Sequence, residues 1–234
     1  MTGSMAPGNN PMRRCRLTRP ITTMTGFDPP LQNIGVQKTP PKTLSVEQID
    51  LFPTRIWQSR LTSLAPHFPA WVAAVNGLRD ASPEPAGRSN RLGWNSADTA
   101  ILNRREFDEL HGAVRACCHY ALQQMGRGDR RFGLESWINI HDRGGFNFLH
   151  MHDGAVLSGV FYLQAPSGSG KLVFRDPRAG PINASFKGAG ANAHNEVQLQ
   201  PEVGLIALFP HWLEHYVEPH QSDLPRIAIS FNAL

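Results

Sequence analysis

The pattern of hydrophobic and polar positions divides the chain into a helical part and a later part made of short strands. Apolar residues recur at helical spacing in His67–Asp80 and, more strongly, in Arg104–Met125, so both segments are predicted to be helices. In the second segment Phe107, Leu110 and Val114 fall on one side of the helix. Gly126 follows at a position suited to end it.

After Gly126 the pattern changes to short apolar or alternating runs separated by turn residues, which is typical of antiparallel strands. An earlier edge strand is predicted over Gln48–Trp57, broken by Pro53. Strands that follow a helical segment favour a mainly β sandwich or jelly roll with helices packed outside. The small-residue segment 179–195 is interpreted as a lid loop. The predicted strands are Glu135–His141, Asn147–His150, Val156–Gln164, Lys171–Phe174, Glu196–Pro201, Leu205–Phe209 and Arg226–Asn232.

Two regions differ in charge and composition. Residues 1–44 hold six basic residues and one acidic residue, a net charge of +5, and show no sustained periodicity. They are interpreted as a disordered basic leader, and Met5, Met12 or Met24 could be the true start. The whole chain carries +4, so residues 45–234, the predicted single domain, carry about −1. The folded domain therefore has no basic signature of nucleic-acid binding.

Membrane and secretory classes are also disfavoured. No apolar run approaches the length of about 18 residues that spans a bilayer, and no signal-peptide pattern is present. Three cysteines, of which Cys117 and Cys118 are adjacent in the longer predicted helix, do not form a disulfide framework. We therefore expect a cytoplasmic protein. The sequence is compatible with a homodimer but does not require one.

Three histidines carry the candidate chemistry. His150 and His152 lie two residues apart in a strand-like run, and side chains at i and i+2 point to the same face of a strand. His215 ends a later apolar run, at a point where a second strand could bring it close. Two histidines and a carboxylate hold non-haem Fe(II) with open positions in many oxygenases. Here a third histidine stands in place of the carboxylate, with His211 and Asp153 as alternative ligands.

Several motifs in order make this chain resemble the 2-oxoglutarate–Fe(II) oxygenase family over about residues 47–234. The resemblance begins modestly at Leu51–Trp57 and Gly93–Ser96 and becomes strong in the second half. The strongest motifs are Trp137–Ile140, Gly144–Asn147, His150-Met-His152, Leu157–Leu163, Gly170–Arg178, Gly204–Pro210, His215 and Arg226–Asn232.

The resemblance implies a double-stranded β-helix, a jelly roll whose mouth holds Fe(II) and the co-substrate 2-oxoglutarate. His150, His152 and His215 would be the iron ligands. Arg226 stands where related oxygenases place the basic residue for the distal carboxylate, and a guanidinium binds carboxylates through two hydrogen bonds. Ser230 lies at an even strand offset from Arg226, so its hydroxyl could share that carboxylate. The arginine-x-serine pattern of related oxygenases places its hydroxyl at position 228, where this chain departs from the pattern with Ala228.

Asn139 and Tyr162 are secondary candidates for contact with the co-substrate, because polar groups at the mouth of a barrel need partners. The function predicted is an Fe(II)- and 2-oxoglutarate-dependent dioxygenase that uses O2 to hydroxylate a C–H bond of a small-molecule or peptide substrate. Two alternatives stay open at this point. One is a cupin-like metal protein with different chemistry, and the other is an inactive jelly-roll binding module.

Overall fold

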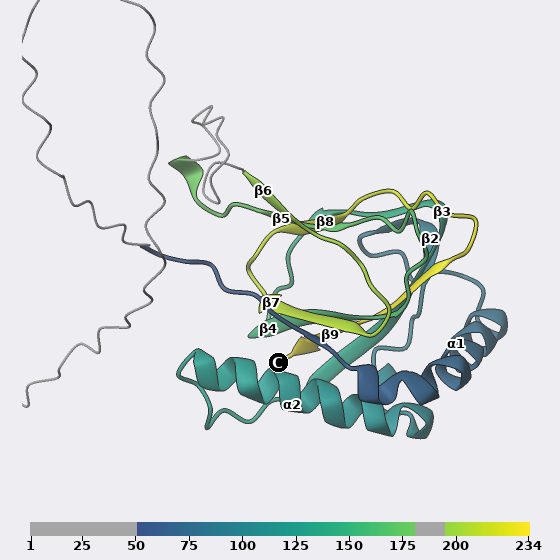
Figure 1. The fold of residues 1–234 in the computed structure, drawn as a ribbon, viewed down its shortest axis with the longest axis horizontal. Coiled ribbons are helices and arrows are strands. Elements are labelled where there is room, and N and C mark those ends of the chain that lie inside the picture. The colour runs from purple at the N-terminus through teal and green to yellow at the C-terminus, as the bar shows by residue number, and fades with distance from the viewer. Residues whose placement is uncertain (1–50, 181–194) are drawn as a thin grey trace, which may run out of the picture. The chain divides into compact units, whose positions relative to one another are not determined.

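A curled sheet of nine antiparallel strands forms the body of the molecule, seen in a computed structural model whose described residues are 51–180 and 195–234 (Figure 1). The strand order is β1-β7-β4-β9-β3-β8-β5-β6, and β2 pairs with β3 beside this path. The strands are β1 (Trp57–Arg60), β2 (Asn90–Asn95), β3 (Leu134–His150), β4 (Leu157–Gln164), β5 (Leu172–Arg175), β6 (Glu196–Leu199), β7 (Leu205–Pro210), β8 (His215–Val217) and β9 (Arg226–Ala233).

The long strand β3 joins the two walls of the curled sheet. Its first half, Leu134–His141, pairs with β9, and its far end pairs with β8 through Asn147↔Val217 and His150↔His215. Figure 1 shows β4, β7 and β9 in one wall and β5, β6 and β8 in the other. We predicted two strands separated at Gly144-Gly145, which is wrong. Gly144 takes a φ of 85° within the continuous strand, a bend that its missing Cβ permits.

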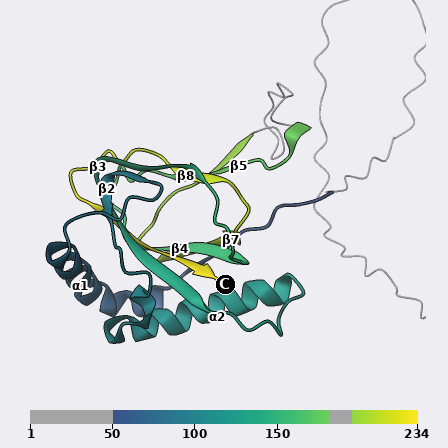
Figure 2. The same ribbon diagram turned by 180° about the vertical axis from the view of Figure 1, so that it is seen from behind.

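Two helices cover the outer face of the wall formed by β4, β7 and β9 (Figures 1 and 2). They are α1 (Phe68–Ala81) and α2 (Asp108–Gln124), which agree with the predicted helices. Gly126 follows α2 with a φ of 73°, the left-handed conformation that favours glycine after a helix. Short 3₁₀ helices at Thr62–His67, Ile101–Asn103 and Arg105–Phe107 lead into or between these elements.

Alternation along the strands separates two hydrophobic clusters. On β4, Phe161 and Leu163 pack with the helices, whereas Val160 and Tyr162 face the interior of the barrel. On β9, Ile227 and Ile229 pack outward in the same way. Apolar side chains thus fill both faces of this wall, which explains why its strands lack a clean polar alternation. The interior cluster occupies one part of the barrel and leaves the rest to polar residues.

Other parts of the sequence interpretation are corrected or lie outside the described residues. The strand expected over Gln48–Trp57 is wrong in its described part, because β1 begins only at Trp57. Strands β2 and β8 were not predicted, because β2 (NRLGWN) shows no clear apolar alternation and β8 has only three residues. The basic leader, and residues 181–194 of the proposed lid, lie outside the described residues. No helix within the described ranges has the length and hydropathy to cross a bilayer.

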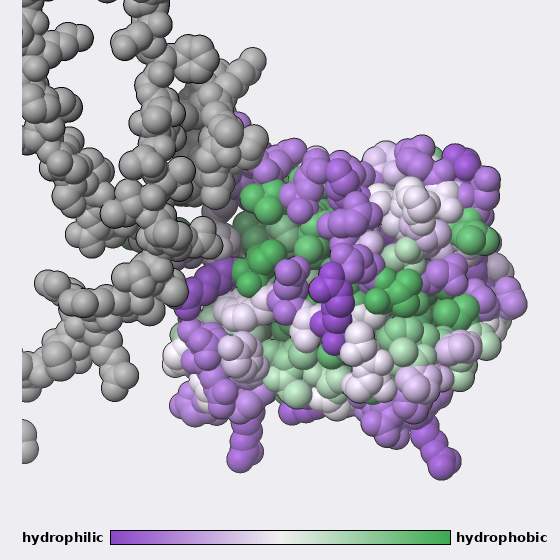
Figure 3. All heavy atoms as spheres, in the orientation of Figure 1, coloured by the Kyte–Doolittle hydropathy of each residue, from purple (hydrophilic) through white to green (hydrophobic). Residues whose placement is uncertain are grey.

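Large apolar side chains at the surface are spread among polar ones. The face in Figure 3 shows hydrophobic and hydrophilic side chains side by side on the body of the molecule. Exposed apolar residues include Phe148, Met151 and Trp212, which lie near the ends of β3 and β7. Scattered exposure of this kind is normal for folded domains and does not by itself mark an interface.

Candidate metal centre and adjoining pocket

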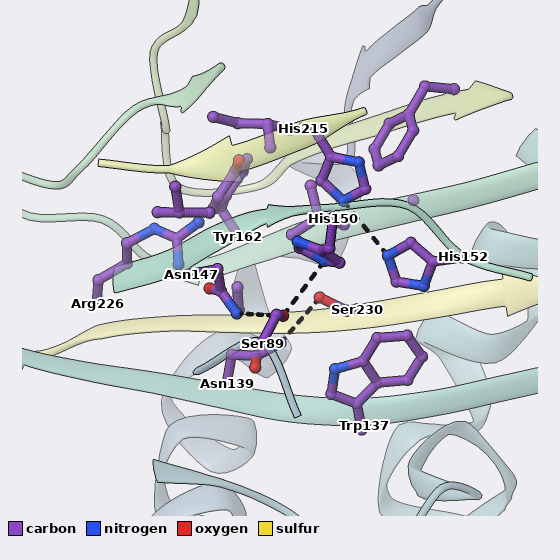
Figure 4. Close-up of a pocket in the computed structure, with 16 residues that line it drawn as sticks. Ser89, Trp137, Asn139, Asn147, His150, His152, Tyr162, His215, Arg226 and Ser230 are labelled. Carbon is purple, nitrogen blue, oxygen red and sulfur yellow. Dashed lines mark hydrogen bonds between the residues drawn. The ribbon is translucent and has the colours of Figure 1, made fainter. Parts of the chain in front are cut away.

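Three imidazole rings, those of His150, His152 and His215, meet at one end of the barrel interior (Figure 4). The ring centroids lie 5.0 Å apart for His150 and His152, 4.4 Å for His150 and His215, and 5.2 Å for His152 and His215. One ring nitrogen from each histidine lies within 4.8 Å of those of the other two. This spacing brings three metal-ligand atoms together from segments more than 60 residues apart in the sequence.

Strand pairing and one short loop position these rings. His150 is the last residue of β3 and is the cross-strand partner of His215, the first residue of β8. His152 lies beyond the strand, so the shared strand face that we predicted does not apply to it. Instead, the His152 backbone N–H donates to the His211 carbonyl, and the His211 ring bonds to the His152 carbonyl through Nδ1 at 2.8 Å. His211 therefore holds the His152 backbone and is not part of the cluster.

Hydrogen bonds from Nδ1 to backbone carbonyls make Nε2 the acceptor nitrogen of His150 and His215. His150 Nδ1 donates to the Phe148 carbonyl at 2.7 Å, and His215 Nδ1 donates to the Leu213 carbonyl at 2.9 Å. The second ring nitrogen of each, Nε2, then carries a lone pair. Nε2 of His215 lies 3.3 Å from Nε2 of His152, so a proton or a cation has to lie between them. A carbonyl that fixes the far nitrogen is the usual support of a metal-binding histidine.

The electrostatic setting keeps the rings uncharged near neutral pH. Burial lowers the pKa of His215 to about 3, and the neighbouring His150 acts in the same direction. Burial also lowers the pKa of His152 to about 4, helped by His150, His211 and Arg88. Neutral imidazole is the form that binds a metal, so the rings already have the required charge at pH 7. By residue type and orientation, the cluster fits a divalent metal ion.

The wall beside the histidines is aromatic and polar. The Trp137 ring stacks on His152 with 5.6 Å between the centroids, and the Arg88 guanidinium lies over the Trp137 ring at 5.0 Å from its centroid. Ser89 Oγ lies 3.3 Å from His150 Nε2 and accepts a hydrogen bond from Asn147 Nδ2 at 3.0 Å. These contacts restrict the rotation of His150 and His152.

Arg226 lies in the same pocket, at the end opposite His152 and Trp137 (Figure 4). Its side chain is 2% exposed and forms no ion pair with any described residue. One guanidinium N–H donates to His141 Nδ1 at 3.2 Å, the group lies over the Tyr162 ring at 5.0 Å, and Nε has no hydrogen-bond partner. The charge of Arg226 is thus buried without an anion.

The remaining candidate residues divide between the two ends of the pocket. Tyr162 is fully buried beside Arg226. Burial raises its pKa, and the nearby guanidinium opposes that rise in part. Asn139 Nδ2 donates to Ser230 Oγ at 2.9 Å, and Ser230 is the cross-strand partner of Trp137. Ser230 and Arg226 lie four positions apart on β9 and both line the pocket, and their sharing of one carboxylate stays a prediction.

The pocket contains no acidic side chain among its described lining residues. Asp153, the acid nearest in sequence to the histidine pair, is exposed and does not belong to the cluster. The lining residues are Ser89, Trp137, Asn139, Asn147, His150, His152, Gly159, Val160, Tyr162, Leu172, Phe209, His215, Val217, Arg226, Ala228 and Ser230.

Sequence reasoning missed two residues that shape this site, Ser89 and His141. His141 could have been found from strand alternation, because Trp137, Asn139 and His141 lie at i, i+2 and i+4 of one strand and share its inner face. Ser89 precedes β2, a strand that periodicity did not reveal, and no local signal marks it.

Comparison with known proteins agrees with this geometry. Residues 135–232 match the family model described as "Putative 2OG-Fe(II) oxygenase". This range contains the three clustered histidines and Arg226. Among curated proteins, no sequence matches the chain.

Solved structures with the same fold share little sequence with the chain. A prolyl-4-hydroxylase from Pseudomonas putida aligns with a TM-score of 0.55 and 18% identity, covering 77% of this chain and 92% of that one. A prolyl hydroxylase from Trichoplax adhaerens, solved with a peptide fragment of hypoxia inducible factor, gives 0.54 and 13%, covering 76% and 83%. The epimerase SnoN of nogalamycin biosynthesis, solved with Fe3+, α-ketoglutarate and nogalamycin RO, gives 0.56 and 15%, covering 77% and 79%. These likenesses establish the jelly-roll fold.

Proposed function

We propose that the chain is an Fe(II)- and 2-oxoglutarate-dependent dioxygenase, because residues 135–232 match the family model described as "Putative 2OG-Fe(II) oxygenase". His150, His152 and His215 would hold the metal, and Arg226 would bind the distal carboxylate of 2-oxoglutarate. Fe(II) bound there, with 2-oxoglutarate and O2, supplies the oxidation of a substrate C–H bond.

The observation that carries this proposal is the uncompensated charge of Arg226 inside the pocket of the histidine cluster. A buried charge without a partner destabilises a fold by several kcal/mol. Here no described acidic side chain lies in the pocket, so the guanidinium is available to an anion from solution. A carboxylate suits it because a guanidinium can donate two parallel hydrogen bonds to the two carboxylate oxygens.

The neutral ligand set strengthens the argument for a dianionic co-substrate. Three uncharged imidazoles leave a divalent metal with its full +2 charge, and Arg226 adds a further +1 in the same pocket. Low dielectric in a buried site increases the attraction between these charges and an anion. A keto acid with one carboxylate near the metal and one at Arg226 would match both positive groups.

Other residues of the chain would orient the ligands and the substrate. Trp137 covers one face of His152 and, with Arg88 over its ring, forms the wall on the metal side of the pocket. The Asn139–Ser230 pair adds hydrogen-bonding groups at the same end. Tyr162 lies under the guanidinium and packs against the deep end of the pocket.

The substrate class is proposed only broadly. The solved structures named above include one with a peptide and one with nogalamycin RO, so we infer a small-molecule or peptide substrate. A cytoplasmic location is proposed because Cys118 is buried and unpaired in the core and Cys117 is also free. A homodimer is a further proposal.

Anaerobic reconstitution with Fe(II), followed by titration with 2-oxoglutarate, tests the function directly. We expect a visible metal-to-ligand charge-transfer absorption that grows to saturation with one equivalent of 2-oxoglutarate per iron. A protein that binds iron but produces no such band would instead support a cupin-like metal protein. A protein that binds neither would be an inactive jelly-roll module.

A further inference from the structure

The inference concerns His141, the residue that contacts Arg226. We infer that His141 is a positioning residue for the co-substrate: its uncharged ring orients the Arg226 guanidinium and leaves the positive charge free for a carboxylate. This inference rests on the proposed function and identifies what makes the deep end of the pocket selective for an acid with a second carboxylate.

The contact is built into the strand pairing. His141 on β3 and Arg226 on β9 are direct cross-strand partners, and both side chains are almost completely buried, with exposures of 0% and 2%. The Arg226 N–H donates to His141 Nδ1 at 3.2 Å. One edge of the guanidinium is therefore fixed, and its plane is supported by Tyr162.

The His141 ring is uncharged at any pH at which the enzyme would work. Burial lowers its pKa to about 2, and the positive charge of Arg226 acts in the same direction, followed by His220. Because Nδ1 accepts a hydrogen bond, its lone pair is used and the proton of the neutral ring is on Nε2. The ring thus accepts a hydrogen bond from Arg226 and does not neutralise the positive charge of the guanidinium.

A glycine on β2 fixes the position of the ring. Gly93 is the cross-strand partner of His141 on the other side of β3, and a Cβ at position 93 would lie 2.8 Å from His141 Cδ2. The same Cβ would lie 2.7 Å from the Ile140 carbonyl oxygen. Any residue larger than glycine would therefore displace the ring or the strand, so the close approach of β2 holds the ring against Arg226.

The choice of histidine matters because most buried arginines are paired with a carboxylate. An aspartate at position 141 would orient the guanidinium equally well, but it would cancel the charge that attracts the co-substrate. An asparagine at the same position places a neutral oxygen close to the position of Nδ1 and keeps the charge free. Asparagine and aspartate have nearly the same shape, so the two variants differ mainly in charge.

The experiment compares full-length wild type, His141→Asn and His141→Asp, each loaded with Fe(II) under anaerobic conditions. The dissociation constants of 2-oxoglutarate and of 2-oxopentanoate are measured by absorption titration. The second acid has the same chain length but a methyl group in place of the distal carboxylate. Iron content and the midpoint temperature of unfolding are recorded for all three proteins as checks of folding.

We expect His141→Asn to bind 2-oxoglutarate within about tenfold of wild type and His141→Asp to bind it about 100-fold more weakly, with iron retained in both. The preference for 2-oxoglutarate over 2-oxopentanoate should fall in the aspartate variant alone. His141→Asp should nevertheless unfold at a temperature no lower than His141→Asn, because it pairs the buried charge. A purely structural role for His141 would not make binding and stability change in opposite directions.

One result overturns the inference while leaving the proposed function intact. It is binding of 2-oxoglutarate by wild type together with equal affinities in the asparagine and aspartate variants, whether unchanged or equally reduced, because the charge at position 141 would then be irrelevant. A wild-type protein that binds Fe(II) but no 2-oxoglutarate refutes the proposed function, and the inference with it.

Discussion

Replacing Arg226 with methionine distinguishes the binding of Fe(II) by the histidine cluster from the binding of 2-oxoglutarate by the arginine. Methionine matches the unbranched stem of the arginine side chain, fits an apolar environment and lacks the charge. The histidine cluster does not contact Arg226 through any hydrogen bond, so the metal ligands should keep their positions. We therefore expect Arg226→Met to bind Fe(II) like wild type and to bind 2-oxoglutarate poorly.

The magnitude follows from the hydrogen bonds that would be lost. A hydrogen bond to a charged group contributes about 1.5–3 kcal/mol, so its loss should raise the dissociation constant of 2-oxoglutarate roughly 10- to 150-fold. The free energy of unfolding should change in the other direction. Removal of a buried charge that has no anionic partner in the pocket should raise it by on the order of 1 kcal/mol in the absence of 2-oxoglutarate.

The assay is a titration of the anaerobic Fe(II) protein with 2-oxoglutarate, beside a metal titration of the apoprotein and urea unfolding of both proteins. Arg226→Lys is the matched control, because it keeps the charge and loses the planar fork, and we expect an intermediate affinity. If Arg226→Met loses iron and 2-oxoglutarate together, Arg226 supports the fold of the pocket and our assignment of its role is wrong.

Three further predictions concern the metal, the pH dependence and the domain boundary. His215→Ala should abolish Fe(II) binding, because it removes the most buried of the three clustered histidines. His211→Phe should only weaken Fe(II) binding, because His211 supports the His152 backbone. If metal analysis finds equal iron in both variants, the cluster is not the metal site. The stability of the metal-free protein should fall as pH falls below 6.5, since the unfolded chain takes up a proton on His141 that the folded chain, with its pKa of about 2, does not. Chemical unfolding at pH 7, 6 and 5 measures this effect. Well below pH 6.5, the free energy of unfolding of His141→Asn should fall by about 1.4 kcal/mol per pH unit less than that of wild type. The same pH dependence in both proteins would contradict an uncharged His141 ring in the folded state. Removal of residues 1–44, which carry a net +5 and no apolar periodicity, should leave Fe(II) and 2-oxoglutarate binding unchanged, and loss of binding in the truncated protein would move the domain boundary.

Much of the candidate site was accessible to sequence reasoning because the residues carry unusual local patterns. The His150-x-His152 spacing and the later His215 and Arg226 pointed to one pocket, and the structure brings all four side chains to it. The prediction that His150 and His152 share one strand face was wrong, because His152 lies beyond the end of β3 and is positioned by the loop that contains His211. The role of each residue as a ligand stays a prediction until binding is measured.

The sequence by itself determined the elements whose signal is local. The helical spacing of apolar residues in Phe68–Ala81 and Asp108–Gln124 reflects burial of one face, and Gly126 marks a backbone conformation that other residues adopt at a cost. Only the tertiary structure decided which strands pair. Strand β8 has three residues, and its place beside the end of β3 sets His215 against His150. The contact between His141 and Arg226, 85 residues apart, likewise depends on the pairing of β3 with β9, because hydrogen bonds between strands carry no signal along the chain.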